Sequence, residues 1–134
     1  MARINVSSKT RLFRGKELEE LKKLDTREFA KLLTARERRS VMRNFGVVES
    51  FIQRSQKKIA NKKSVKTHDR EMVIVPAMVG MKIGVHNGNN FVPVLITSEM
   101  LGHRLGEFAL TRKVVKHGAA GVGATKSSSA LSVK

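Results

Sequence analysis

The sequence predicts an α+β protein: a small three-stranded antiparallel sheet with short helices, preceded by a basic helical N-terminal extension and followed by an extended basic tail. Three observations predict this class. Apolar residues recur at helical spacing in the first half of the 134-residue chain, β-prone runs alternate with turn residues in the middle, and the end combines glycine, serine and positive charge. We therefore divide the chain into an N-terminal arm (1–16), a helical extension with a basic linker (17–65), an α+β body (66–111) and a flexible tail (112–134).

The first helices are predicted from leucine spacing and from a capping signal. Leu18, Leu21 and Leu24 recur on one helical face, and the glutamates around them favour a first helical turn. Asp25 with Glu28 three residues later is typical of a capping box, which satisfies two backbone N–H groups at a helix start. A second helix is therefore expected to begin there.

Two further helices are expected before residue 60. Thr34 with Glu37 repeats the capping signature and opens a helix whose exposed side carries arginines. Gly46 is expected to end it. An amphipathic helix then follows, with its apolar face formed by Val48, Phe51, Ile52 and Ile59. Residues 60–66 lose the apolar period and are interpreted as a linker.

The middle of the chain changes to a β pattern. Residues 72–75 form a short β-prone run that ends at a proline, and they are expected to be the first strand. Residues 82–86 and 91–96 flank a four-residue gap that contains Asn87-Gly88, a strong signal for a hairpin. Pro93 has no N–H to donate, so its strand is expected at the edge of the sheet.

Charge indicates the kind of partner. The chain has 27 Lys and Arg against 11 Asp and Glu, a formal net charge of +16. The excess falls in three tracts, within residues 36–43, 54–70 and 112–134, around a nearly neutral segment. Such tracts are typical of proteins that bind a polyanion. With six Phe and no Trp or Tyr, the chain is expected to recognise phosphates and shape rather than to stack on bases, which fits structured RNA or duplex DNA.

Several other classes are excluded or disfavoured. The chain has no cysteine, so a disulfide scaffold, a cysteine-ligated zinc site and a thiol nucleophile are excluded. No run approaches the roughly 18 apolar residues that span a bilayer, so no membrane partner is expected. Residues 1–16 hold five Lys and Arg, two Ser and no acid. They fit an organellar transit peptide, but a basic arm that binds a polyanion explains the same composition.

Neither metal nor cofactor chemistry is predicted. The four histidines are spaced 18, 17 and 14 residues apart, which matches no local metal-ligand motif. A hydrolase that uses His103 and Glu107 is disfavoured, because Gly102 and Gly106 oppose the helix that would place both side chains on one face. The glycines of 118–123 follow no strand and lack the lysine of a phosphate-binding loop. We expect no catalytic residues, no metal and no cofactor.

Several motifs occur in one order along the chain and resemble a known family. They include Val85-His-Asn-Gly88, Phe91-Val-Pro-Val94, Glu99-Met-Leu-Gly-His103, Leu105-Gly-Glu-Phe108 and Thr111-Arg112. The chain thereby resembles small-subunit ribosomal protein nineteen in the universal numbering, called fifteen in eukaryotes. Phe13-Arg-Gly15, Ala35-Arg-Glu-Arg-Arg39 and Lys116-His-Gly118 are similar to the archaeal and eukaryotic branch.

The resemblance implies a non-enzymatic structural protein in the head of the small ribosomal subunit, located in the cytoplasm. Its implied partners are small-subunit ribosomal RNA, small-subunit ribosomal protein thirteen and, through the C-terminal tail, transfer RNA near the decoding region. The alternative is an architectural protein that binds duplex DNA through its basic helices.

Candidate RNA-binding residues come from the basic tracts and from the motifs. The tracts and motifs before residue 71 contribute Arg36, Arg38, Arg39, Lys66, His68 and Arg70. By resemblance, the hairpin tip and the following loop contribute His86, Asn87, Gly88, His103, Arg104 and Gly106. Also by resemblance, the start of the tail contributes Arg112, Lys113, Lys116 and His117, and its tRNA-proximal part Thr125, Lys126, Ser127 and Ser128.

Overall fold

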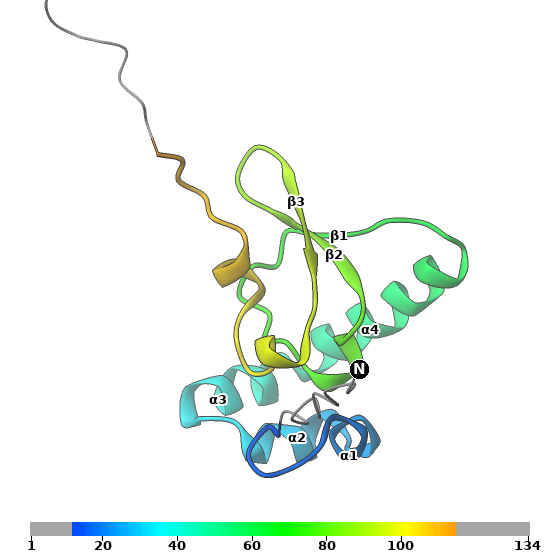
Figure 1. Ribbon diagram of the computed structural model, residues 1–134, viewed down its shortest axis with the longest axis vertical. Coiled ribbons are helices and arrows are strands. Elements are labelled where there is room, and N and C mark those ends of the chain that lie inside the picture. Colours follow the sequence, from blue (N-terminus) through cyan, green and yellow to red (C-terminus); the bar gives the residue numbers. More distant parts are fainter. Residues whose placement is uncertain (1–11, 115–134) are drawn as a thin grey trace, which may run out of the picture.

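Helices come first along the chain and a small sheet follows (Figure 1). The computed structural model describes residues 12–114, so the predicted arm up to residue 11 and the tail from residue 115 lie outside the described part. The α-helices are α1 Leu18–Lys23, α2 Thr26–Leu32, α3 Ala35–Arg43 and α4 Phe45–Ala60. The strands are β1 Val65–Thr67, β2 Lys82–His86 and β3 Phe91–Leu95, and the 3₁₀ helices are η1 Pro76–Met78, η2 Ser98–Met100 and η3 Leu105–Phe108. The predicted α+β class is confirmed.

The capping signals place the first helices correctly. Asp25 precedes α2, and its backbone N–H donates to Glu28 Oε2 at 3.4 Å, which is one half of the predicted capping box. Leu21 of α1 and Phe29 of α2 are buried, as the apolar spacing predicts. Thr34 likewise precedes α3.

The boundary between α3 and α4 differs from the prediction. Gly46 was expected to end a helix, but it lies in the first turn of α4. The chain breaks earlier, at Asn44, whose carbonyl accepts hydrogen bonds from the N–H groups of Val47 and Val48 and so starts the next helix. Further along α4, Ile59 is 45% exposed, so the apolar face predicted for this helix ends before its last turn.

The sheet is mixed, and the prediction of a purely antiparallel sheet is wrong. The strand order is β1-β2-β3, with β1 parallel to β2 and β2 antiparallel to β3. The error comes from the first strand, which is β1, at the end of the predicted linker, rather than residues 72–75. A long crossover separates β1 from β2, and this allows the parallel pairing.

Residues 72–75 pair with a loop instead of the sheet. All four side chains are buried, whereas a strand with one exposed face alternates between buried and exposed residues. Ile74 N–H donates to His103 O at 2.9 Å, and Gly102 N–H donates to Ile74 O at 3.1 Å. The run therefore anchors the loop around His103 against the core.

The hairpin agrees with the prediction. β2 and β3 pair over 82–86 and 91–95, and Asn87 Oδ1 accepts the N–H groups of Asn89 and Asn90 to close the tip. Pro93 lies on β3 opposite Gly84, and β3 is one of the two edge strands of the sheet, as predicted.

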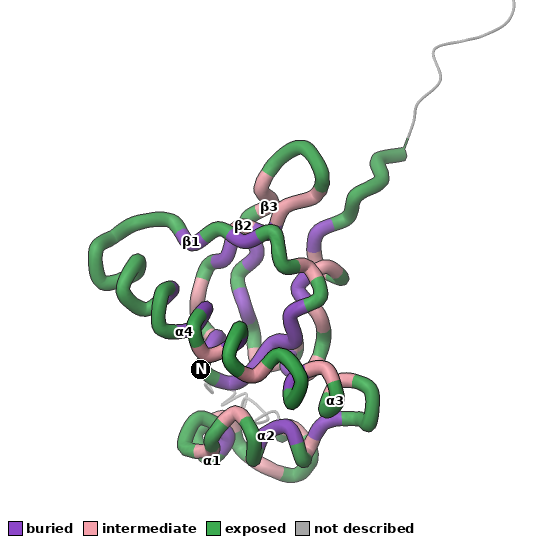
Figure 2. Tube along the Cα trace, turned by 180° about the vertical axis from the view of Figure 1, so that it is seen from behind, coloured by how far each residue is buried: buried purple, intermediate pink, exposed green. Residues whose placement is uncertain are grey.

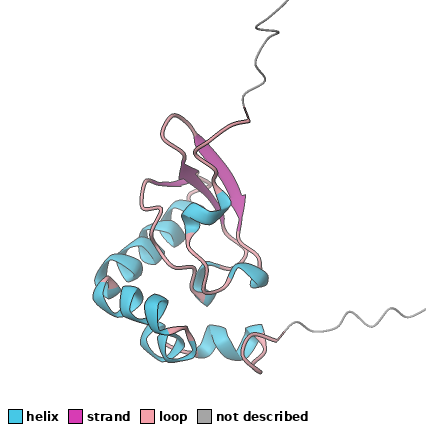
Figure 3. Ribbon diagram, turned by 90° about the vertical axis from the view of Figure 1, so that its left-hand side faces the viewer, coloured by secondary structure: helices cyan, strands magenta, loops and turns pink. Residues whose placement is uncertain are grey.

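One apolar core joins the helices to the sheet. It extends in sequence from Leu21 to Ala109 and includes Ile83, Val85 and Val94 on the inner face of the sheet. The tube in Figure 2 shows these buried segments between the helices and the strands, with an exposed hairpin tip. In Figure 3 the α-helices follow one side and the base of the molecule, and the hairpin lies away from them. No helix in the described range is long and apolar enough to cross a membrane.

Candidate nucleic-acid interface

Arg70 forms the centre of the region that carries most of the candidate residues. Its side chain is half-buried, and its Nη1 donates to the backbone carbonyl of His86 at 2.5 Å. Its Nη2 donates to the carbonyls of Gly106 at 2.9 Å and Ala109 at 2.6 Å. Hydrogen bonds from a charged donor contribute about 1.5–3 kcal/mol each. Arg70 therefore joins the base of the hairpin tip to the segment around η3.

Gly106 supports the same junction from the other side. Its N–H donates to Arg70 O at 2.8 Å. A Cβ at this position would lie 3.0 Å from Arg70 O and 3.1 Å from Arg70 Cβ, closer than side chains normally pack. Glycine allows this approach, so both Arg70 and Gly106 hold the frame that presents the other candidates.

The hairpin tip presents His86, Asn87 and Gly88 at the end of the sheet. Gly88 N–H donates to His86 Nδ1 at 3.1 Å, and Gly88 is exposed with a φ of +103°, which glycine adopts without strain. The side-chain oxygen of Asn87 is used within the loop. The tip is thus a turn closed by its own hydrogen bonds, with Gly88 exposed at its end.

Three rings meet beside this tip. The centroids of His68 and His86 lie 4.5 Å apart, and Phe91 lies 5.1 Å from His68 and 5.0 Å from His86. Lys66 Nζ lies 5.2 Å from the centroid of Phe91. The scarcity of aromatic residues predicts no stacking surface, and the sequence pattern did not indicate this ring cluster around Phe91. The available signal was the hairpin register, which places Phe91 opposite His86.

A second group of candidates lies in the loop before η3. His103 Nδ1 and Glu107 Oε2 are 2.7 Å apart, so the expectation that the neighbouring glycines keep these residues apart is wrong. The 3₁₀ turn of η3 brings the Glu107 side chain back to the start of η3. There Glu107 Oε1 accepts a hydrogen bond from the Arg104 N–H at 3.1 Å. This backbone hydrogen bond is the largest cause that keeps the pKa of Glu107 below its usual value; His103 and the charge of Arg104 lower it further, against an opposing effect of desolvation.

The arginines of α3 lie next to this loop. Arg104 Nη2 donates to Ser40 Oγ of α3 at 3.2 Å. Arg36 and Arg39 are exposed, whereas Arg38 Nη2 donates to Leu33 O at 3.1 Å. Helix α3 therefore lies against the loop 102–107, and both elements carry candidate arginines.

The remaining candidates belong to the C-terminal segment. Arg112 and Lys113 are exposed where the chain leaves the body (Figure 1). The other tail candidates lie outside the described residues: Lys116, His117, Thr125, Lys126, Ser127 and Ser128.

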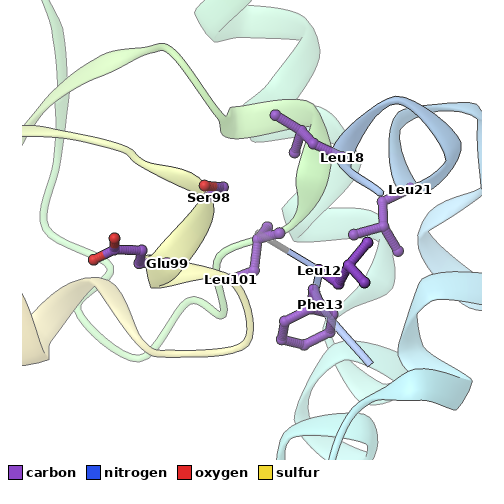
Figure 4. A pocket seen from close by; sticks show the side chains of 7 residues that line it. All are labelled: Leu12, Phe13, Leu18, Leu21, Ser98, Glu99 and Leu101. Atoms are coloured by element: carbon purple, nitrogen blue, oxygen red, sulfur yellow. The ribbon is translucent and has the colours of Figure 1, made fainter. Parts of the chain in front are cut away.

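Two further features of residues 12–114 concern metal and ligand binding. Within residues 12–114, no group of three or more histidine and acidic side chains is placed to hold a metal ion. A hollow of about 370 Å³ between the start of α1 and η2 is lined mostly by apolar side chains, among them Leu12, Phe13 and Leu101 (Figure 4). It contains none of the basic candidates, so it does not suit phosphate.

Exposed basic side chains, held on a frame of internal hydrogen bonds, are the features of a structural nucleic-acid-binding protein. The family model of ribosomal protein S19 matches residues 39–117, from within α3 to beyond η3. The chain belongs to the ribosomal protein S19 family. It is therefore an RNA-binding constituent of the small ribosomal subunit, and the family is structural rather than enzymatic.

Proposed function

We propose that the chain is part of the head of the small subunit and binds folded ribosomal RNA through the hairpin tip, the loop 102–107 and helix α3. The observation that carries this proposal is the Arg70 junction, which holds the hairpin tip and the loop in one fixed relation. Two exposed elements fixed in this way fit the shape of a folded RNA better than an unstructured strand. The body over 66–111 is then the main RNA-binding part.

The C-terminal tail is proposed to reach towards transfer RNA at the decoding region. Arg112 and Lys113 are exposed, and the sequence from Arg112 to the end contains five positive charges and no acid. Such a segment is attracted to phosphates along its whole length. We further propose ribosomal protein thirteen of the small subunit as a neighbour and the cytoplasm as the location, as the resemblance implies.

The motifs Phe13-Arg-Gly15 and Ala35-Arg-Glu-Arg-Arg39, by their resemblance, support our proposal that the chain belongs to the archaeal and eukaryotic branch. Residues 12–38 precede the matched span and form α1, α2 and the start of α3. The Phe13 ring lies 5.7 Å from that of Phe29, and Leu33 packs beside Gly102. This N-terminal segment therefore packs beside Gly102, which lies within the matched span.

Sedimentation tests the ribosomal role. Cell lysate is separated on a sucrose gradient with the tagged full chain, and we expect the protein in the small-subunit fractions. Crosslinks from His86–Gly88 and from Arg104 to ribosomal RNA are expected in the same fractions. Presence only in the light fractions would contradict the proposal.

An architectural DNA-binding role is the second candidate, favoured by the outward basic residues of α4, Arg54, Lys57 and Lys58. Competition at a fixed salt concentration between a folded small-subunit RNA fragment and duplex DNA of equal length distinguishes the ribosomal role from the DNA-binding role. We expect the RNA to displace the DNA at lower concentration; the reverse order would favour the DNA-binding role.

A further inference from the structure

We propose that the outer face of the sheet binds an unpaired nucleotide, with its base stacked on Phe91 and its phosphates held by lysines. This inference rests on the proposed RNA-binding function and adds a recognition mode to it. It concerns a surface next to the hairpin tip rather than the tip itself.

The strand register builds the site. Ile83 and Val85 point into the core, so the alternate residues of β2 face outward. Gly84 lies opposite Lys66 on one side and Pro93 on the other, and His86 lies opposite Phe91. The outward row of β2 therefore consists of Lys82, Gly84 and His86. It lies beside the outward row of β3, which consists of Leu95, Pro93 and Phe91.

A groove of about 570 Å³ follows these rows and continues to the end of α4. Its apolar lining includes Ile59, Met81, Phe91 and Pro93. Gly84 lies between Lys66 and Phe91. A Cβ added at Gly84 would lie 3.4 Å from both Lys66 Cγ and Phe91 Cβ. The absence of a side chain at Gly84 keeps the surface of the sheet low beside Phe91. A base that stacks on the Phe91 ring would take the place of Lys66 Nζ, which lies 5.2 Å from the ring centroid.

The charge of the groove defines the occupant as an anion. Its lining contains four lysines, Lys62, Lys63, Lys66 and Lys82, and no acidic residue. Lysines supply the phosphate contacts of single-stranded nucleic acids, whereas aromatic rings supply stacking of about 1–3 kcal/mol per base. An acidic peptide would use the lysines but gain little from the ring cluster, so an RNA strand with an exposed base fits both features.

Fluorescence of 2-aminopurine tests the stacking. The full chain is mixed with a single-stranded RNA nonamer that carries one central 2-aminopurine, and with the same RNA paired to its complement. We expect quenching on the single strand and much less on the duplex. The Phe91→Leu variant is expected to lose most of the quenching and about tenfold in affinity, as a stacking contribution of about 1.4 kcal/mol corresponds to a factor of ten.

Phe45→Leu is the matched control, because the Phe45 side chain is half-exposed and lies outside the groove. Its ring centroid lies 4.3 Å from Cζ of Arg27. Equal quenching by Phe91→Leu and Phe45→Leu, with both variants folded by circular dichroism, would overturn the inference. The double variant Lys66→Gln with Lys82→Gln is expected to reduce the salt slope of binding by about 1.4, at about 0.7 for each contact on a single strand. An unchanged slope would also overturn it.

The two proposals fail in different ways. If Phe91→Leu quenches 2-aminopurine and binds the nonamer as the wild type does, while the wild type binds folded small-subunit RNA, only the proposed stacking site is wrong. If the wild type binds no RNA in either form, the proposed function fails as well. Displacement of the nonamer by polyglutamate at lower concentration than by unlabelled RNA would show an acidic protein partner and overturn the inference.

Discussion

Arg70 donates a hydrogen bond to the backbone carbonyl of His86, 16 residues later in the chain, at 2.5 Å. The same guanidinium bonds Gly106 and Ala109, 36 and 39 residues away. A residue selected as an RNA contact because of its charge therefore uses that charge within the protein. If the hairpin binds RNA as proposed, we expect Arg70 to affect that binding indirectly, through the position of His86.

Arg70→Lys is expected to lower the free energy of unfolding by about 2–3 kcal/mol, because an ammonium group cannot reach three carbonyls at once. Urea denaturation at 0.3 M KCl, which screens the net charge of +16, measures this change. Arg39→Lys is the control, since Arg39 is exposed, and its effect is expected within about 0.5 kcal/mol. Equal midpoints for the two variants would show that the Arg70 junction contributes nothing to stability.

Two glycines are expected to respond to alanine in opposite directions. Gly106→Ala forces a Cβ against Arg70 O at 3.0 Å and is expected to cost about 1–3 kcal/mol. Gly46→Ala, with open space around a helical position of α4, is expected to stabilise by about 0.5–1 kcal/mol. Thermal unfolding measures the change in stability of each variant relative to the wild type. A gain from Gly106→Ala would mean that the loop adapts to the methyl group at no cost.

Ser55 is a buried residue of α4 whose hydroxyl has no hydrogen-bond partner within the described part of the chain. Ser55→Ala is expected to be neutral or to stabilise by about 0.5–1 kcal/mol, because it removes an unsatisfied buried polar group. Thr67 is also buried, but its Oγ1 accepts the N–H of Asp69 at 3.0 Å. Thr67→Val is therefore expected to destabilise by about 1 kcal/mol. Similar denaturation midpoints for both variants would contradict this distinction.

The lowered pKa of Glu107 predicts an acid-sensitive contribution to stability. A carboxyl with a depressed pKa in the folded state stabilises the fold above its unfolded pKa, near the ordinary value of 4.5, and loses this contribution as the pH falls through the folded value. Glu107→Gln is expected to reduce stability at pH 7 and to reduce it less at pH 3. Urea midpoints at the two values measure the difference. A loss of equal size at both pH values would show that charge at Glu107 is irrelevant.

Local signals predicted the helices and the hairpin. Asp25 and Thr34 mark the starts of α2 and α3, and at Asp25 the capping box with Glu28 forms between residues three positions apart. Asn87-Gly88 marks the tip between β2 and β3 for the same local reason. These features depend on side chains that interact within a few residues of their own backbone.

The sequence pattern did not predict the pairings between residues far apart in the chain. β1 has three residues and pairs in parallel across a crossover, so neither its length nor its periodicity distinguishes it from a linker. The run 72–75 has strand propensity, but burial on both sides directs it to the loop at His103. The candidate site shows the same limit: charge selected Arg70 as an RNA contact, whereas the fold shows that its guanidinium binds three backbone carbonyls.

Substitutions at Lys62 distinguish the effect of backbone strain on stability from the effect of charge on RNA binding in the proposed groove. It has a φ of +53° just after α4, where its N–H donates to Ile59 O at 2.9 Å, a position that glycine adopts most easily. Lys62→Gly is therefore expected to stabilise the protein by about 0.5–1 kcal/mol and to weaken binding of single-stranded RNA, since one groove lysine is lost. Thermal unfolding and fluorescence anisotropy with the RNA nonamer measure the two effects.

Lys62→Arg and Lys62→Asn complete this test. Arginine keeps both the charge and the strained backbone, so RNA affinity and stability are expected to remain near those of the wild type. Asparagine removes the charge but tolerates the left-handed conformation, so it is expected to match glycine in lost affinity. If Lys62→Gly binds RNA as tightly as Lys62→Arg, Lys62 does not contact phosphate, and its position after α4 serves only the turn into β1.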